Sequence, residues 1–171
     1  DAFIPWEEYD HPVYGKVEIG GFSKNFGRTH PGFLLEADAH RNTAFCFYHA
    51  YQTPKLVVRD IKVEDLKGSH KQVTATIANQ RLMPTHSGQN LKYSIDPPDY
   101  VYLDGGEVIA GMIVHDVDNN ICEEQPYKPE RLEVDNIPGN STVTVRWIVK
   151  GGNKFTVRVE SVKGGRAEKT Y

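Results

Sequence analysis

Hydrophobic and polar residues alternate with a period of two along much of the chain after residue 54. The clearest runs are 73–77, 142–149 and 155–160, in which aliphatic or aromatic residues alternate with threonine or charged residues. A segment with one apolar and one mostly polar face is typical of a half-buried antiparallel strand. Further strands are expected at 57–65, 91–95, 107–114 and 130–134.

Glycine-containing turns separate these runs. Lys67-Gly68-Ser69 and Gly151-Gly152-Asn153 are expected to close hairpins between neighbouring strands. No helical pattern interrupts the strands, and the polar segment 115–130 is expected to be a long loop. A set of about seven short strands with turns between them predicts a mainly β domain, an immunoglobulin-like antiparallel β-sandwich.

The pattern before residue 54 is different. Residues 14–20 (YGKVEIG) predict a strand, and residues 33–52 predict a helix without internal Gly or Pro and with a proline soon after its end. Apolar side chains lie on every side of this helix, which indicates burial on several sides. The sandwich is too small to wrap it alone, so we expect that the helix lacks a neighbour. The apolar residues are Leu34, Leu35, Ala37, Ala39, Ala44, Phe45, Cys46, Phe47, Tyr48 and Ala50.

Charge and a proline place a domain boundary between residues 54 and 55. Residues 1–54 carry seven acidic and four basic side chains, whereas residues 55–171 carry equal numbers of each. The residue before Pro54 is pushed out of the helical region of backbone space. We therefore expect two parts, 1–54 and 55–171.

Composition excludes several classes of protein. The net charge of −3 argues against a nucleic-acid binder, which needs basic residues for phosphate contacts. No stretch approaches the roughly 20 apolar residues of a membrane span, and two cysteines cannot form a disulfide scaffold. The sequence begins at Asp1 without an initiator Met or a signal peptide, so we expect a processed chain or part of a longer one.

A stretch of the form W-x-x-[FY]-D-H-P-x-[YL]-G-x-V-E-I-G-G runs from Trp6 to Gly21, and the predicted helix contains FLLE at 33–36 and HRNTAF at 40–45. In these features, residues 3–50 resemble the end of the catalytic domain in bacterial zinc carboxypeptidases of the carboxypeptidase A type. Residues 55–171 are similar only in a general way, including PDYVYLDGGEV at 98–108, to the β-sandwich that such enzymes often bear at the C-terminus.

The resemblance implies an α/β peptidase domain that uses one zinc ion and a catalytic glutamate to hydrolyse C-terminal peptide bonds. Its zinc site needs an H-x-x-E pair and a distant histidine, because zinc takes about four ligands and one of them is the water that it activates. None of the seven histidines is followed by glutamate at the third place. His11, His30, His40, His49, His70, His86 and His115 are followed there by Tyr14, Phe33, Thr43, Gln52, Val73, Gln89 and Asp118.

We therefore expect no catalytic, metal-binding or cofactor-binding residues in this chain. Zinc is expected only in the parent enzyme, and the missing partner is an N-terminal catalytic domain of the same parent chain. Glu18 lies on a strand shortly before the terminal helix, where the general base of the family belongs. Members with the VEIGG stretch usually carry the catalytic glutamate on an earlier strand, so a salt-bridged or binding-rim role for Glu18 is favoured.

The remaining candidates favour structural roles. His40 and His49 lack the i,i+4 spacing of helical metal ligands, and Ser87 and Ser141 lack a G-x-S-x-G elbow. Asp116, Asp118 and Asn120 imitate the start of a calcium loop, but Ile121 and Tyr127 replace its glycine and glutamate. Cys46 is expected to be a buried apolar filler, and Cys122 lies beside two acids, which disfavour a nucleophile. Tyr93, Tyr100, Tyr102 and Tyr127 favour strand packing over a sugar platform.

Two functions remain. In the first, the chain is the inactive C-terminal part of a secreted or periplasmic metallocarboxypeptidase that acts on peptides, and its sandwich is an accessory module. In the second, the chain is a free-standing sandwich that binds carbohydrate or protein, since sandwiches host many functions.

Overall fold

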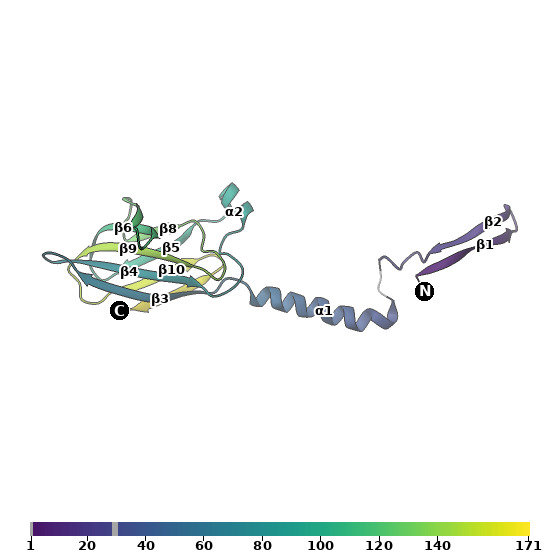
Figure 1. Ribbon diagram of the computed structural model, residues 1–171, viewed down its shortest axis with the longest axis horizontal. Coiled ribbons are helices and arrows are strands. Elements are labelled where there is room, and N and C mark those ends of the chain that lie inside the picture. The colour runs from purple at the N-terminus through teal and green to yellow at the C-terminus, as the bar shows by residue number, and fades with distance from the viewer. Residues whose placement is uncertain (1, 29–30) are drawn as a thin grey trace. The chain divides into compact units, whose positions relative to one another are not determined.

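The computed structural model describes residues 2–28 and 31–171 (Figure 1). The chain divides into two compact units, Asp1–Tyr48 and His49–Tyr171. The helix α1, Gly32–Tyr51, begins in the first unit and ends in the second.

The first unit contains the antiparallel hairpin of β1 (Phe3–His11) and β2 (Gly15–Phe22). The predicted strand at 14–20 is present as β2, and β1 is an additional strand. Gly20 has a φ of 159° and approaches β1 so closely that a Cβ there would lie 2.6 Å from the Cα of Trp6. Gly20 and Gly21 of the VEIGG stretch therefore leave room for the main chain and the ring of Trp6 on the opposite strand.

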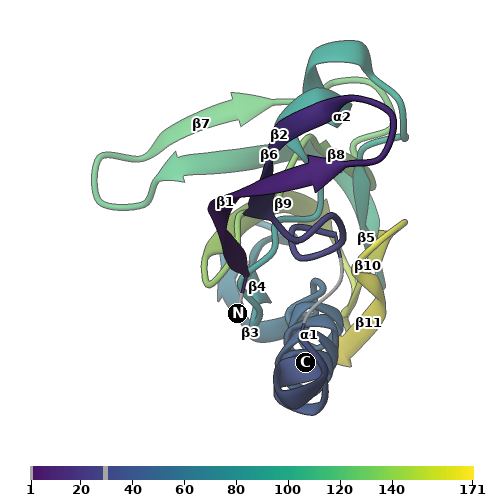
Figure 2. The same cartoon turned by 90° about the vertical axis from the view of Figure 1, so that its right-hand side faces the viewer.

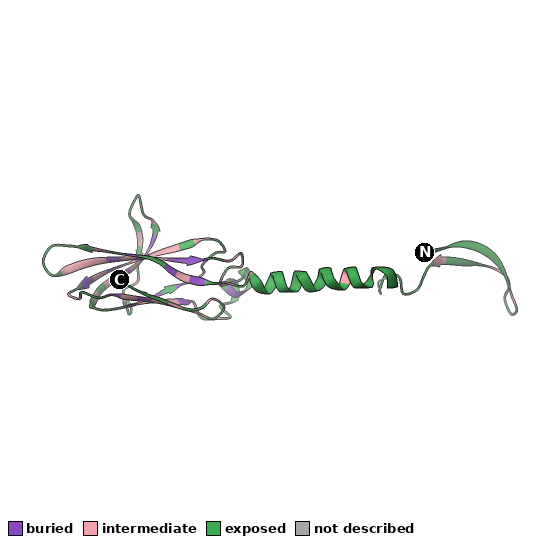
Figure 3. Cartoon of the chain, turned by 90° about the horizontal axis from the view of Figure 1, so that it is seen from below, coloured by how far each residue is buried: buried purple, intermediate pink, exposed green. Residues whose placement is uncertain are grey.

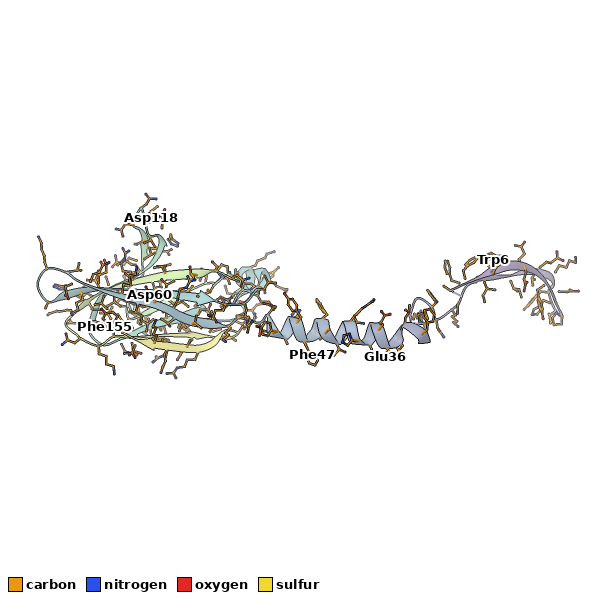
Figure 4. All side chains as sticks on the ribbon, turned by 60° about the horizontal axis from the view of Figure 1, so that its bottom comes forward. Trp6, Glu36, Phe47, Asp60, Asp118 and Phe155 are labelled. Carbon is orange, nitrogen blue, oxygen red and sulfur yellow. The ribbon has the colours of Figure 1, made fainter. Side chains whose placement is uncertain are left out.

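No described residue of the first unit is buried, as the exposure colours of Figure 3 show. On α1, Phe33 is 85% exposed and Phe47 is 72% exposed, and Trp6 on β1 is 60% exposed. Figure 4 shows Phe47 and Glu36 on α1 and Trp6 on the hairpin. The apolar side chains on several sides of α1, which predicted a buried helix, are therefore not buried within the described residues.

The second unit is a β-sandwich of two antiparallel sheets. The strands are β3 (Leu56–Asp65), β4 (His70–Asn79), β5 (Asp99–Asp104), β6 (Glu107–Asp116), β7 (Ile121–Glu124), β8 (Arg131–Val134), β9 (Thr142–Lys150), β10 (Thr156–Ser161) and β11 (Gly165–Thr170). One sheet has the order β3-β4-β9-β6-β7 and the other β11-β10-β5-β8. Without β7 and β8, these orders are those of the ABED and CFG sheets of immunoglobulin domains, so the predicted fold class is confirmed.

The core lies between the two sheets. Trp147 on β9 and Phe155 before β10 are its largest side chains, with 0% and 1% exposure. Around them pack the inward residues of the predicted runs, including Val73, Ala75, Ile77, Val145, Val149, Val157 and Val159. The alternation read from the sequence therefore identifies the buried face correctly in these strands.

Several local predictions are wrong. The predicted strand 91–95 is instead the short helix α2, Gly88–Tyr93, because the Ser87 hydroxyl caps its first turn by accepting from the Asn90 amide at 3.2 Å. The predicted loop 115–130 contains β7, and β5 and β11 are additional strands.

The turn Gly151-Gly152-Asn153 does not close a hairpin, because β9 and β10 belong to different sheets. The turn instead carries the chain across the sandwich, which the positive φ angles of both glycines, 69° and 84°, permit. Lys67-Gly68-Ser69 does connect the paired strands β3 and β4 as predicted.

Candidate functional site

Buried polar side chains gather around the loop 80–98, which connects β4 to β5. The fully or nearly fully buried polar residues are Asn79, Thr85, His86, Asn90 and Asp99. Asn79 and Asp99 stand at the two ends of this loop, on β4 and β5. Buried polar groups need partners, so their hydrogen bonds show how the loop is held.

Asn79 fixes the start of the loop. Its Oδ1 accepts from the amides of Lys55 at 3.2 Å and Arg81 at 3.1 Å, and its Nδ2 donates to the carbonyl of Met83 at 2.8 Å. One side chain therefore joins Lys55, just before β3, to Arg81 and Met83 at the start of the loop.

His86 fixes the far end of the loop. Its Nε2 lies 3.0 Å from the carbonyl oxygen of Pro97, and its Nδ1 lies 3.2 Å from Thr85 Oγ1 and 3.7 Å from Asp99 Oδ2. Thr85 Oγ1 accepts in turn from the Ile137 amide at 2.9 Å, which ties the loop to the segment between β8 and β9.

Asp99 is the least expected member of this cluster. Its side chain is fully buried, and neither carboxylate oxygen has a well-aligned hydrogen bond within the described part of the chain. Burial raises the pKa of the Asp99 carboxyl, although the hydroxyls of Ser161 and Thr85 and the charges of His86 and Lys163 lower it. Burial is the largest of these effects on Asp99.

A cavity of about 350 Å³ lies beside the cluster. Its lining includes His86, Asn90, Ser94, Asp96 and Asp135. Asp96 accepts from Asn90 Nδ2 and lies 3.6 Å from Lys163 Nζ. The loop therefore borders a polar, acidic cavity, and the nearly buried imidazole of His86 forms part of its wall.

The same loop holds the end of α1. The guanidinium of Arg81 lies 3.5 Å from the ring centroid of Tyr51, and a hydrogen bond from Arg81 lowers the pKa of that phenol. Gln52 accepts from the amide of Leu82 through Oε1 and from the amide of Met83 through its carbonyl, each at 3.1 Å.

The tyrosines considered for a sugar platform do not form one. Tyr100 and Tyr102 lie half-buried on β5, and the guanidinium groups of Arg131 and Arg158 stack on them, 4.6 and 4.5 Å from the two ring centroids. A ring face covered by arginine is not free for a sugar. Tyr93 and Tyr127 lie elsewhere, on α2 and in the segment between β7 and β8.

The imitation calcium loop is the tip of the β6–β7 hairpin, which projects beyond the two sheets (Figure 2) and carries Asp118 (Figure 4). Asp116 accepts from the main-chain and side-chain amides of Asn119, at 2.9 and 2.7 Å, and from the amide of Asp118 at 2.9 Å, and these bonds lower the pKa of its carboxyl. This carboxylate is committed to the turn, so a solvated turn is the better interpretation.

The other sequence candidates do not converge. Glu18 is exposed on β2 opposite Glu8, which pairs with Lys16 at 2.7 Å. His40, His49 and Cys46 are exposed on α1, so the expected burial of Cys46 is wrong.

Ser87 caps α2, and the Ser141 carbonyl accepts from the Asn79 amide. His30 lies outside the described residues. Among the residues that the structure describes, no group of three or more His, Cys, Asp or Glu could hold a metal ion.

Two features could not be found from the sequence. Cys122 lies on β7, where its Sγ is 3.7 Å from Arg146 Nη1 of β9, a cation that sequence neighbours do not reveal. The sequence pattern predicts a strand at 91–95 and none at 99–104, so it does not single out Asp99. Its only signal is an acid at an inward position of the alternating run Asp99–Asp104.

Residues 55–171 match the protein family described as a domain of unknown function, DUF8731. The chain belongs to this family. The DUF8731 match begins at Lys55 and contains both sheets of the sandwich, and it leaves out the hairpin and α1. A search of curated proteins finds no match.

Two solved structures are distantly similar to the chain. A conjugative transposon lipoprotein from Bacteroides eggerthii is 14% identical, with 70% of this chain and 94% of the lipoprotein covered at a TM-score of 0.33. A GH20 exo β-N-acetylglucosaminidase from Vibrio harveyi is 10% identical, with 69% and 17% covered at a TM-score of 0.29. Scores this low support no assignment of function. In the described part of the chain, no helix is long and apolar enough to cross a membrane.

Proposed function

We propose that this chain is the C-terminal part of a zinc metallocarboxypeptidase, in which the first unit completes an α/β peptidase domain and the DUF8731 sandwich is an accessory module. The parent would hydrolyse C-terminal peptide bonds with zinc-activated water, outside the cytoplasm, in the periplasm or after secretion. The chain alone would be inactive.

The observation that carries the proposal is the first unit without a core. Its aromatic residues Trp6, Phe33 and Phe47 are at least 60% exposed, and none of its described residues is buried. Exposed apolar patches of this extent mark a contact surface. Because residues 3–50 resemble the end of a peptidase domain, the rest of that domain is the part of the parent protein that would cover them.

The proposal assigns no chemistry to residues of this chain. The zinc ligands and the catalytic glutamate would lie in the parent's N-terminal domain, because no H-x-x-E pair occurs in the sequence. Zinc would there activate the attacking water. The exposed Glu18, opposite Glu8, fits a surface role better than that of a base.

A second candidate is a free-standing module that binds carbohydrate or protein. The sandwich favours it in one respect, since its core is complete without any residue of the first unit. The arginine-covered tyrosines of β5 weigh against carbohydrate stacked on that sheet.

The test uses the natural full-length protein and this 171-residue chain side by side. Release of a C-terminal amino acid from an N-blocked peptide, abolished by a chelator and restored by zinc, is expected for the full-length protein alone. A natural gene without H-x-x-E and a later histidine upstream of Asp1, or a full-length protein without this activity, would refute the proposal.

A matched pair of variants tests the contact surface. In the full-length protein, Phe47→Ser on α1 should lower the thermal midpoint of the peptidase domain, because it places a hydroxyl in the proposed contact. Ile109→Ser, at a 49% exposed position of β6, should leave that midpoint unchanged. Equal effects of the two substitutions would show that α1 has no such contact.

A further inference from the structure

The imidazole of His86 joins two parts of the loop 80–98. His86, near the middle of the loop, reaches the carbonyl of Pro97, two residues before β5. A carbonyl oxygen can only accept, so Nε2 of His86 carries a proton and donates it to Pro97. In the neutral imidazole, Nδ1 therefore presents a lone pair.

That lone pair faces a buried acid. Nδ1 lies 3.7 Å from Asp99 Oδ2, and the side chains of His86 and Asp99 are 3% and 0% exposed. Thr85 Oγ1, 3.2 Å from Nδ1, donates its hydrogen to Asn136 Oδ1 at 3.3 Å. If neither His86 nor Asp99 carried a further proton, a buried carboxylate would therefore face a nitrogen lone pair without a hydrogen between them. A buried charge in that position is strongly unfavourable.

We propose that loop 80–98 is a pH-dependent latch, held closed by one proton that Asp99 and His86 share. The proton sits on Asp99 as a neutral acid or on Nδ1 of His86 as an ion pair, and the closed loop needs it in either place. Loss of this proton opens the loop.

Five further groups surround the pair. Lys163 after β10 lowers the pKa of Asp99, as do the hydroxyls of Thr85 and Ser161. Asp96 and Asp135 line the neighbouring cavity with His86. Asp96 is itself paired with Asn90 and Lys163. These contacts account for the charge of Asp96, whereas the contacts of His86 and Asp99 leave one proton to be placed.

Proton counting gives the direction of the response. In an open loop, exposed histidines and aspartates titrate near about 6.5 and about 3.9. Between these values the open and closed loops each hold one proton, so closing is independent of pH. Above about 6.5 only the closed loop holds it, and the closing equilibrium falls up to about tenfold per pH unit.

Hydrogen exchange of the chain tests the latch. The amides of Thr85 and His86, bonded to Ile137 and Asn136, report loop opening, and amides of β4 report global unfolding. Protection of the loop amides, corrected for intrinsic exchange rates, should be constant from about pH 5 to about pH 6.5 and fall up to about tenfold per unit above it. The β4 amides should be more strongly protected at every pH and should share this fall, because the globally unfolded chain also lacks the shared proton.

Asp99→Asn supplies a permanent amide donor toward Nδ1 and should remove the alkaline fall. Asp96→Asn, which changes an acid of the neighbouring cavity, should keep it. A wild-type loop with constant protection to pH 9, or an Asp99→Asn loop with the wild-type slope, would overturn the proposal. If Asp99→Asn does not fold, the wild-type slope still decides.

Discussion

The side-chain amide of Gln125 makes two 2.8 Å hydrogen bonds with the main chain of Glu133, donating to its carbonyl and accepting from its amide. Glu133 lies on β8, which is an edge of its sheet. The main-chain amide of Gln125 donates to the carbonyl of Gly111 on β6, at 2.9 Å. One glutamine thus acts as a strand partner for an edge and joins the two sheets.

Gln125→Ala should lower the free energy of unfolding by about 1–3 kcal/mol, because it leaves two main-chain groups of β8 without their partner. Gln125→Glu should lower it as well, since a carboxylate can accept from the Glu133 amide but cannot donate to its carbonyl. Urea unfolding followed by circular dichroism measures both. The control is Gln72→Ala, whose half-buried side chain on β4 donates to Glu64 Oε2 at 3.1 Å. It should change stability by less than about 0.5 kcal/mol.

Gly111 is required by a close approach of the chain. A Cβ at this position would lie 2.3 Å from the carbonyl oxygen of Pro129, which also accepts from Trp147 Nε1 at 3.0 Å. Gly111→Ala should therefore destabilise the sandwich by about 1–3 kcal/mol through overpacking.

Gly88→Ala is the matched control, because a Cβ there meets nothing within 4 Å. It should be neutral or stabilising by about 0.4–1 kcal/mol. Thermal unfolding of both variants measures the difference, and equal midpoints would contradict the close approach.

The sandwich could be predicted from the sequence where a strand has one buried face. Val73, Ala75 and Ile77, like Val145 and Trp147, alternate because one face of their sheet is in the core and the other is in water. The edge strands β7 and β11 lack this signal, because most of their residues are exposed.

The candidate site could not be predicted, because its partners come from separate segments. Thr85, His86 and Asp99 all lie outside the predicted strands; only the folded chain brings them together. The segment around Leu91 and Tyr93 alternates like a strand, but the Ser87 cap decides in favour of a helix. Local hydrogen bonding outweighs periodicity over so short a segment.

Residues 49–171 should fold without the first unit. Every residue of the core cluster lies in this range, and Gln52 retains its bonds to Leu82 and Met83. The shortened chain keeps one of the two tryptophans, the fully buried Trp147.

Its fluorescence should be that of a buried indole and shift to the red in one cooperative step with urea. Residues 1–48 alone should show no cooperative transition, because none of their described residues is buried. A solvent-exposed emission spectrum from the folded 49–171 chain would contradict this independence.

Arg81 should control the acidity of Tyr51. The Arg81 side chain lies over the Tyr51 ring, and its hydrogen bond and charge hold the pKa of the phenol below its usual value of 10.0. Because the folded state favours the phenolate, the contact strengthens as the pH rises from the folded pKa toward 10.0. Arg81→Leu should return the pKa of Tyr51 toward 10.0, which carbon chemical shifts of labelled tyrosine rings measure. Arg81→Lys keeps the charge without the planar stack and should leave part of the shift. A Tyr51 titration that is the same in the wild-type chain and in Arg81→Leu would show that Arg81 does not hold the end of α1 in this way.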